Sequence, residues 1–394
     1  MKEKDENSFL SKITFISSLG DFISYFAVLV MVNDLSKSVA VAAYSITIRT
    51  MAVALGGACF PYFSRYFSTK KLILSSQLLS GVVIAILALY WTFGSNHSVL
   101  LIFALLFIET FLKQIFDGAK EVKSKSLGDE DAQRGLQAQL LHGFYGAQFW
   151  GPIASFFLLK NLPLVVPLWI DVASFFIAMV MASRLSDSFL PVKYKLFAPL
   201  NYLKNNKDQM KIFFLRSVGM WVPIGIFNYM LFPTIQSHYG LELINSAWVY
   251  VAIGLGSMIA TGFLKEDFKT LRLMSDWKIA AIGFFALGLT RFAFISLPTF
   301  PMALAVLAIG GICNGANATA TQSIRRKVTT TAQLPEFIGL ELLVGRVTDI
   351  VVSTICFLLL QHQLMTYKVG MILSAVSLFA LGIVANQPSS ARRS

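Results

Sequence analysis

The segment Leu72-Ile-Leu-Ser-Ser-Gln-Leu-Leu-Ser-Gly-Val-Val-Ile-Ala-Ile-Leu-Ala-Leu-Tyr-Trp-Thr-Phe93 contains no charged residue and is rich in aliphatic side chains. A helix of about 20 apolar residues crosses the ~30 Å hydrocarbon layer of a bilayer, because each residue adds about 1.5 Å. The length and composition of this segment therefore predict a transmembrane helix.

Similar apolar runs recur along the whole chain of 394 residues, in which 56% of the residues are hydrophobic and 14% are charged. The mean hydropathy of +0.66 indicates that lipid is the solvent. The runs are too long and too continuously apolar for the alternating strands of a membrane barrel, so we expect an all-α membrane protein. The twelve predicted transmembrane helices are Phe9–Val32, Val39–Phe63, Leu72–Phe93, Val99–Gly118, Gly135–Leu159, Leu164–Ser183, Gln209–Gln236, Ile244–Leu264, Trp277–Leu297, Pro301–Ser323, Phe337–Leu360 and Thr366–Ala385.

The positions of the 33 Lys and Arg residues show how to interpret the formal net charge of +12. Of these, 25 fall in the termini and in the loops on one side of the predicted bundle, 3 fall in the opposite loops, and 5 lie within predicted helices. Loops rich in Lys and Arg stay in the cytoplasm, so this asymmetry predicts that both termini are cytoplasmic. The basic charge reports membrane topology, and we expect no nucleic-acid binding.

The sequence offers no pattern typical of an enzyme, a metal site or an ATP-driven pump. Cys59, Cys313 and Cys356 fall within predicted helices, and the four histidines lack a metal-ligand spacing. There is no His-Glu-x-x-His arrangement, no nucleophile elbow and no Walker A loop. We therefore expect no catalytic residues, no disulfide bond, no bound metal and no cofactor.

A weak internal repeat with a spacing of about 200 residues divides the chain into two halves. Phe15-Ile-Ser-Ser-Leu-Gly20 matches Phe214-Leu-Arg-Ser-Val-Gly219, and Leu55-Gly56 matches Leu255-Gly256. Each copy has six helices, so both copies enter the membrane in the same direction. We predict two parallel six-helix bundles, residues 1–184 and 209–394, related by a pseudo-twofold axis along the membrane normal. Residues 185–208 form the predicted cytoplasmic linker between them.

Several local patterns resemble those of a known transporter family. Leu19-Gly20-Asp21 lies in the first predicted helix, Phe116-Asp117-Gly118-Ala119-Lys120 ends the fourth, and Asp171-Val-Ala-Ser-Phe175 in the sixth is similar to an Asp-x-x-Ser-Phe pattern. Together with the two halves, these patterns resemble the major facilitator superfamily. Within that superfamily they are similar to the bacterial drug and siderophore exporters of the enterobactin-exporter and macrolide-efflux type. The resemblance implies transport by alternating access.

The loop between the second and third predicted helices bears on gating. It reads Pro61-Tyr-Phe-Ser-Arg65-Tyr-Phe-Ser-Thr-Lys70-Lys71. In the superfamily this loop usually carries a Gly, an Asp and basic residues that latch the cytoplasmic gate, and here Arg65 takes the position of the Asp. On this resemblance we expect Arg65, Lys70 and, at the end of the fourth helix, Asp117 to act in gating.

Charged residues within the predicted helices are the candidate site residues. A charge at mid-bilayer costs ~2.5 to 3.5 kcal/mol on insertion scales, so each should face a partner or a water-filled cavity. Asp21 lies in the first predicted helix and Arg49 in the second. Two interpretations stay open for Asp21: it binds a proton or the substrate, or it forms a structural ion pair with Arg49.

Two further groups of charges follow helical spacing. Glu109, Lys113 and Asp117 lie at i, i+4 and i+8 on the fourth helix, so they share one face and can neutralise one another. The family resemblance implies instead that Glu109 and Lys113 line the central cavity. Arg346 and Asp349 lie three residues apart on the eleventh helix. They either form a pair within the helix or contribute to substrate or proton binding.

Taken together, these features predict a secondary active transporter that exports a small amphipathic molecule, such as a drug or siderophore, in exchange for protons. We expect a monomer in the cytoplasmic (inner) membrane of a bacterium, whose partners are the small-molecule substrate, protons and the lipid bilayer. One alternative is a ferroportin-like transporter of a metal ion, or a siderophore uptake permease. The alternative from another class is a membrane sensor of the same fold that transports nothing.

Overall fold

The computed structural model describes residues 3–37, 39–94, 96–128, 132–187, 203–204, 206–241, 245–265 and 274–387. All regular elements within these ranges are helices. They are α1 (Glu3–Ser36), α2 (Val39–Tyr66), α3 (Thr69–Phe93), α4 (Val99–Lys125), α5 (Gln133–Asn161), α6 (Val165–Ala182), α8 (Lys207–Phe214), the π-helical turn η1 (Leu215–Gly219), α9 (Met220–Tyr239), α10 (Ser246–Lys265), α12 (Asp276–Ser296), α13 (Phe300–Val328), α14 (Leu334–Gln361) and α15 (Tyr367–Asn386). Most of the predicted linker over residues 185–208 lies outside the described residues.

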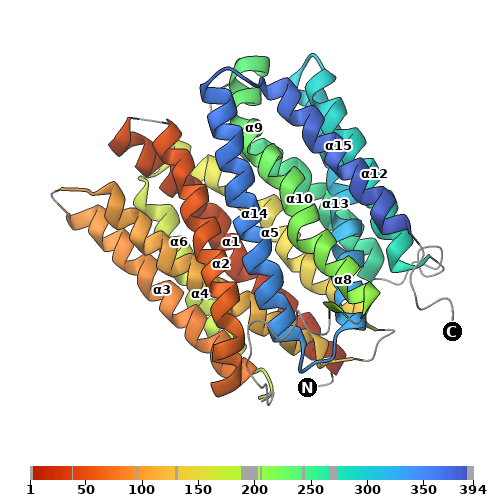
Figure 1. Ribbon diagram of the computed structural model, residues 1–394. Coiled ribbons are helices and arrows are strands. Elements are labelled where there is room, and N and C mark those ends of the chain that lie inside the picture. Colours follow the sequence, from red (N-terminus) through yellow and green to blue (C-terminus); the bar gives the residue numbers. More distant parts are fainter. Residues whose placement is uncertain are drawn as a thin grey trace.

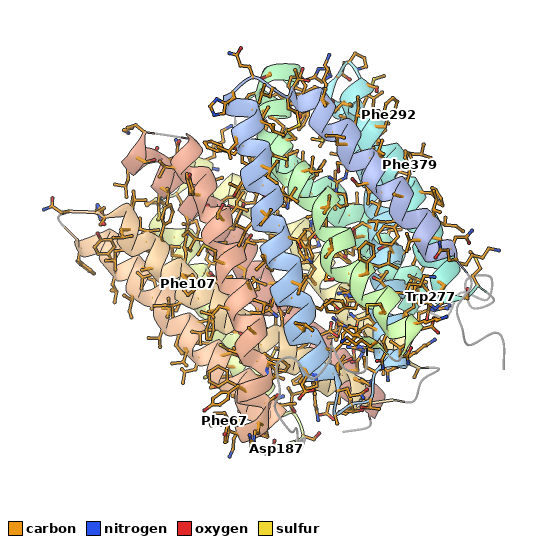
Figure 2. All side chains as sticks on the ribbon, viewed as in Figure 1. Phe67, Phe107, Asp187, Trp277, Phe292 and Phe379 are labelled. Carbon is orange, nitrogen blue, oxygen red and sulfur yellow. The ribbon has the colours of Figure 1, made fainter. Side chains whose placement is uncertain are left out.

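The prediction of an all-α membrane protein is confirmed. Eleven helical stretches among the described residues are long and apolar enough to cross a membrane, with α8, η1 and the first part of α9 counted as one stretch. The helix α5 is more polar, has 29 residues, and packs between α1 and α10. Large apolar side chains are exposed on the outside of the bundle, among them Phe292 (Figure 2), as expected for a surface that faces lipid.

Helix starts in the described chain follow from local capping. The side-chain oxygens of Ser68, Ser275 and Thr366 accept hydrogen bonds from backbone N–H groups three residues later, which begins α3, α12 and α15.

Helix ends differ more from the prediction. The helix α4 runs to Lys125 and α13 to Val328, beyond the predicted ends at Gly118 and Ser323. The basic residues of these last turns, which we had expected in loops, are therefore helical.

The helices α1 to α6 pack against one another and form the first half, and α8 to α15 form the second half. In Figure 1 the first half is coloured red to yellow and lies mostly on the left, and the second half is coloured green to blue. The two halves meet along two seams, α5 against α10 and α2 against α14. We call the end of the bundle at which α1 begins and α15 ends the terminal end.

Glycines allow the closest approach of backbones at the two seams. A Cβ atom added to Gly254 of α10 would lie 2.8 Å from the backbone nitrogen of Phe149 in α5. A Cβ atom on Gly339 of α14 would lie 2.8 Å from the carbonyl oxygen of Gly57 in α2. Real Cβ atoms do not come this close to backbone, so any larger side chain would push the halves apart.

We predict that Gly254→Val destabilises the protein by about 1 to 3 kcal/mol, because the backbone of α5 cannot give way as a flexible side chain could. The apparent unfolding temperature of the purified protein measures this effect. Gly135→Val is the matched control, since a Cβ atom on Gly135 meets nothing within 4 Å and should change stability by at most about 0.5 kcal/mol. Equal unfolding temperatures for the two variants would contradict the close contact at this seam.

Candidate functional site

The centre of the first half holds two buried ion pairs between helices. Lys113 of α4 contacts the carboxylate of Asp21 in α1, and Arg49 of α2 lies 3.6 Å from Glu109 of α4. Thr110 also donates a hydrogen bond of 2.9 Å to Glu109. Both carboxylates are almost completely buried, whereas the two cations are each slightly exposed. The pairs therefore join three helices and leave their cationic members nearest to water.

These contacts correct two sequence-based interpretations. The partner of Asp21 is Lys113 and not Arg49. The predicted self-neutralising stripe on α4 is also wrong, because Glu109 and Lys113 each pair with a residue of another helix. Asp117, the third member, pairs with Lys120 one turn further along the same helix at 2.5 Å. Spacing on one helix correctly placed the three side chains on one face but could not identify what that face meets.

Arg49 also links the pairs to the other half of the molecule through aromatic rings. Its guanidinium carbon lies 5.3 Å from the centre of the Tyr25 ring. The Tyr25 ring in turn lies 6.3 Å from that of Tyr250 in α10. A movement of Arg49 would therefore change the packing of these rings at the interface between the halves.

In the second half, Arg346 and Asp349 of α14 form the pair within one helix that their spacing predicted, at 3.6 Å. The guanidinium of Arg346 lies 3.7 Å from the centre of the Trp221 ring. A Cβ atom on Gly225 of α9 would lie 2.8 Å from a carboxylate oxygen of Asp349, so α9 approaches this pair closely. The pair is therefore fixed between α9 and α14.

A cavity of about 290 Å³ lies between α2, α9 and α14, away from the terminal end. Asp349 is the charged residue of the cavity lining. The lining also includes Thr50, which directly follows Arg49 in the sequence. The remaining lining combines aromatic, aliphatic, hydroxyl and amide groups: Tyr44, Ile46, Thr47, Asn228, Tyr229, Pro233, Gln236, Ile350, Ser353, Thr354, Phe357 and Leu360. Such a lining can bury an apolar body and still hold polar groups of a ligand.

At the terminal end the two halves are joined by buried ion pairs. Glu121 of α4 accepts hydrogen bonds from Arg325 at 2.8 Å and Arg326 at 3.1 Å, both on α13. Arg325 also lies 3.3 Å from Glu341 of α14, which pairs with Arg216 of η1 at 2.8 Å. The side chain of Arg326 is 0% exposed. We call these five residues the terminal ion-pair network.

A second set of contacts at the same end reinforces this closure. Asp276 of α12 pairs with Arg134 of α5 in the other half and with Lys327 of α13 at 3.0 Å. Lys125, at the end of α4, donates to the carbonyl oxygen of Arg326 at 2.7 Å and to that of Thr329. The last turns of α4 and α13 are therefore bound together across the interface.

A smaller cavity of about 210 Å³ lies next to the terminal ion-pair network. Its lining includes Glu121, Arg216 and Arg325 of the network, together with Asp117 and Gln137. The π-helical turn η1 carries Arg216, and such turns occur frequently at functional sites. Several charged side chains therefore line the smaller cavity, whereas Asp349 is the charged residue that lines the larger one.

The three predicted gating residues lie at or near the terminal end but outside the network. Asp117 lines the smaller cavity. Arg65 is exposed and lies 5.4 Å from the ring centre of its neighbour Tyr66, and Lys70 is half-buried. Across the described ranges, no ion pair involves Arg65 or Lys70. Their gating roles stay predictions.

The sequence did not identify the network for two reasons. Glu121, Arg325 and Arg326 lie beyond the predicted helices, where charges normally face water, and the basic residues there were assigned to topology. Arg216 and Glu341 lie within predicted helices, but they are 125 residues apart in the sequence. Within the described part of the chain, no group of three or more His, Cys, Asp or Glu side chains is placed to hold a metal ion.

No protein-family model and no curated protein matches the chain, but solved structures do. The human organic anion transporter MFSD10 superimposes with a TM-score of 0.77 at 11% identity, covering 96% of this chain and 99% of its own. The E. coli fucose:proton symporter FucP gives a TM-score of 0.71 at 12% identity, with coverage of 98% and 100%. A bacterial homologue of the iron transporter ferroportin, in an outward-facing state with soaked iron, gives 0.69 at 15% identity, with coverage of 96% and 98%. The chain therefore has the fold of major facilitator transporters along nearly its whole length.

Proposed function

We propose that this protein is a secondary active transporter of the major facilitator type that works by alternating access. The observation that carries this proposal is the asymmetry of the interface between the halves. Buried ion pairs join the halves at the terminal end, whereas a cavity lies between α2, α9 and α14 towards the opposite end. A transporter needs such an arrangement, because its central site must be closed on one side while it is accessible from the other.

The sidedness of this conformation follows from the positive-inside distribution of Lys and Arg. If the terminal end faces the cytoplasm of a bacterium, the ion-pair network is a cytoplasmic gate and the larger cavity faces outward. The ferroportin homologue of similar fold was also solved in an outward-facing state. Export rather than uptake is favoured by the motifs shared with drug and siderophore exporters.

The cavity supports a small amphipathic substrate. Its aromatic and aliphatic walls suit an apolar body, its hydroxyl and amide groups suit polar substituents, and Asp349 offers a negative charge. The three proteins of similar fold are an organic anion transporter, a fucose:proton symporter and a homologue of an iron transporter, so the fold alone does not select a substrate. A metal ion and a siderophore taken up from outside are therefore retained as arms of the test.

Proton coupling is proposed for the buried pairs of the first half. Asp21 and Glu109 each have one cationic partner, and any movement that separates a pair leaves a buried carboxylate that must gain a proton or another cation. A proton and a conformational change are thereby linked at the same side chains. This is the exchange that an antiporter requires.

We predict that inside-out vesicles containing the protein dissipate an imposed proton gradient when its substrate is added. A dye-quench assay with antibiotics, siderophores and divalent metals measures this effect. Asp21→Asn and Glu109→Gln should abolish the proton flux, while Asp187→Asn, an exposed carboxylate at the terminal end (Figure 2), should retain it.

Three outcomes would contradict parts of the proposal. Full proton flux in both variants would exclude the two buried pairs as the coupling site. A response to divalent metals alone would favour metal transport. The absence of any response over a broad panel would favour the non-transporting sensor.

A further inference from the structure

The carboxyl group of Asp171 on α6 lacks a cationic partner. Asp171 is 1% exposed, its Oδ2 atom has no hydrogen bond of ordinary geometry, and the hydroxyl of Ser24 in α1 is the polar group of the neighbouring helix that interacts with the carboxyl group. Its Oδ1 atom lies 3.4 Å from the hydroxyl of Ser174, which itself donates to the backbone carbonyl of Asp171 at 2.8 Å. No ion pair in the described chain involves Asp171. A buried ionised carboxylate in these surroundings would carry a large desolvation penalty.

Asp171 lies directly against the part of α1 that carries Asp21. A Cβ atom on Gly20, the residue before Asp21, would overlap the Oδ1 atom of Asp171 and the side chain of Ser174. Asp171 is also within electrostatic range of Asp21, Glu109 and Lys113. It therefore belongs to the same cluster as the two ion pairs.

The charges in this cluster do not balance. It contains three carboxylates, Asp21, Glu109 and Asp171, but only two cations, Arg49 and Lys113. Asp21 contacts Lys113 and Glu109 is paired with Arg49, so Asp171 is the carboxylate left over. The addition of one proton makes the cluster neutral, as a membrane-buried site requires.

The other helices that pack against α6 bring no further charge to this level. The charged residues of α3 are Lys70 and Lys71, which lie in its first turn. Those of α5 are Arg134 and Lys160, which lie near its two ends. His142 of α5 faces α10 instead, where its ring lies 3.1 Å from the carbonyl oxygen of Met258.

We infer that Asp171 binds a proton in this conformation and is the proton-carrying residue of the cluster. The role in coupling rests on the proposed transport function, whereas the bound proton does not. Asp171 itself has almost no exposure to water, but Lys113 and Arg49 are 19% and 17% exposed. Asp21 contacts the more exposed Lys113 and follows Gly20, which packs against Asp171, so we assign the proton's route to Asp21.

The transfer follows from the arrangement of the two aspartates. When Lys113 moves away from Asp21, the freed carboxylate of Asp21 accepts the proton as the O–H bond of Asp171 breaks. The proton then leaves Asp21 for water, and the released Lys113 pairs with the ionised Asp171. At the end of this sequence Lys113 neutralises Asp171, and the ionised Asp21 is the carboxylate without a cation, so it is the group that accepts the next proton.

The test is infrared spectroscopy of the purified protein in lipid, which detects the carbonyl stretch of a protonated carboxyl group without requiring transport. We expect the wild type to show this band at neutral pH, and we expect 13C-labelled aspartate to shift it. Asp171→Asn should remove the band, because the amide cannot be protonated in the same way. The matched control Asp187→Asn should retain it, since Asp187 is exposed.

Each other result would overturn the inference. If the wild-type protein lacks the band, or if labelled aspartate does not shift the band, then no aspartate holds a proton. This measurement uses the wild type alone, so it does not depend on the folding of a variant. A band that persists in Asp171→Asn but disappears in Asp21→Asn would place the proton on Asp21. If the protein shows the band but transports nothing, the bound proton on Asp171 stands and only the proposed transport function is refuted.

Discussion

Replacing Glu121 by Gln should release the terminal end and shift the protein towards the conformation that is open there. Glu121 is the carboxylate that pairs with Arg326, whose side chain is completely buried. Its removal leaves Arg326 without a negative partner, and breaking a buried pair in this way costs about 3 to 5 kcal/mol. A change of 3 kcal/mol alters the ratio of open to closed forms on the order of a hundredfold.

Accessibility of a single cysteine measures this release. Leu141→Cys places a thiol in the smaller cavity next to the network, in a background where Cys59, Cys313 and Cys356 are replaced by Ala. Labelling by a membrane-impermeant maleimide from the terminal end should be slow in the parent and much faster with Glu121→Gln.

The matched control for this experiment is Asp187→Asn at the same end of the bundle. The side chain of Asp187 is exposed and forms none of the ion pairs of the described residues, so its loss should cost less than about 1 kcal/mol and leave labelling slow. Equal labelling rates in the Glu121 and Asp187 variants would show that the terminal ion-pair network does not keep this end closed.

Replacing Lys113 by Gln should destabilise the first half more than any other single charge removal in its centre. Asp21 would lose its contacting cation while remaining buried, at a cost of about 3 to 5 kcal/mol. The double variant Asp21→Asn and Lys113→Gln should be more stable than Lys113→Gln, because two neutral side chains can hydrogen-bond without a stranded charge.

The loss of stability caused by Lys113→Gln should also depend on pH. At low pH a proton neutralises the stranded carboxylate, so the variant should approach wild-type stability, and the deficit should grow as the pH rises and the proton leaves. The apparent unfolding temperature across the pH range measures this. Lys120→Gln is the control, since its partner Asp117 is 35% exposed and can stay ionised in contact with water. A pH-independent deficit in Lys113→Gln would contradict the buried-pair explanation.

The helices themselves could be predicted from sequence because lipid imposes a strong and simple requirement on composition. The apolar run Leu72–Phe93 lies within α3, and Thr366–Ala385 almost coincides with α15. The prediction ended α4 and α13 too early because it used hydropathy alone. A Lys or Arg that is paired across a helix interface is compatible with a buried helical turn, and hydropathy cannot distinguish it from one that faces water.

The partners of the buried charges could not be predicted for a different reason. Lys113 and Asp21 are separated by 92 residues, and helical spacing reports only neighbours within one helix. For Arg346 and Asp349 the partner lies on the same helix, and the predicted pair was correct. In the sequence, Asp171 stands only in the Asp-x-x-Ser-Phe pattern of the sixth helix, and its lack of a cationic partner follows from the positions of the neighbouring helices.

The complete burial of Arg326 also bears on how the protein responds to ionic strength. Dissolved ions screen charges at a surface over about 8 Å at physiological salt, but they cannot enter a contact from which water is excluded. Added salt should therefore do little to loosen the terminal end, whereas a surface latch would weaken.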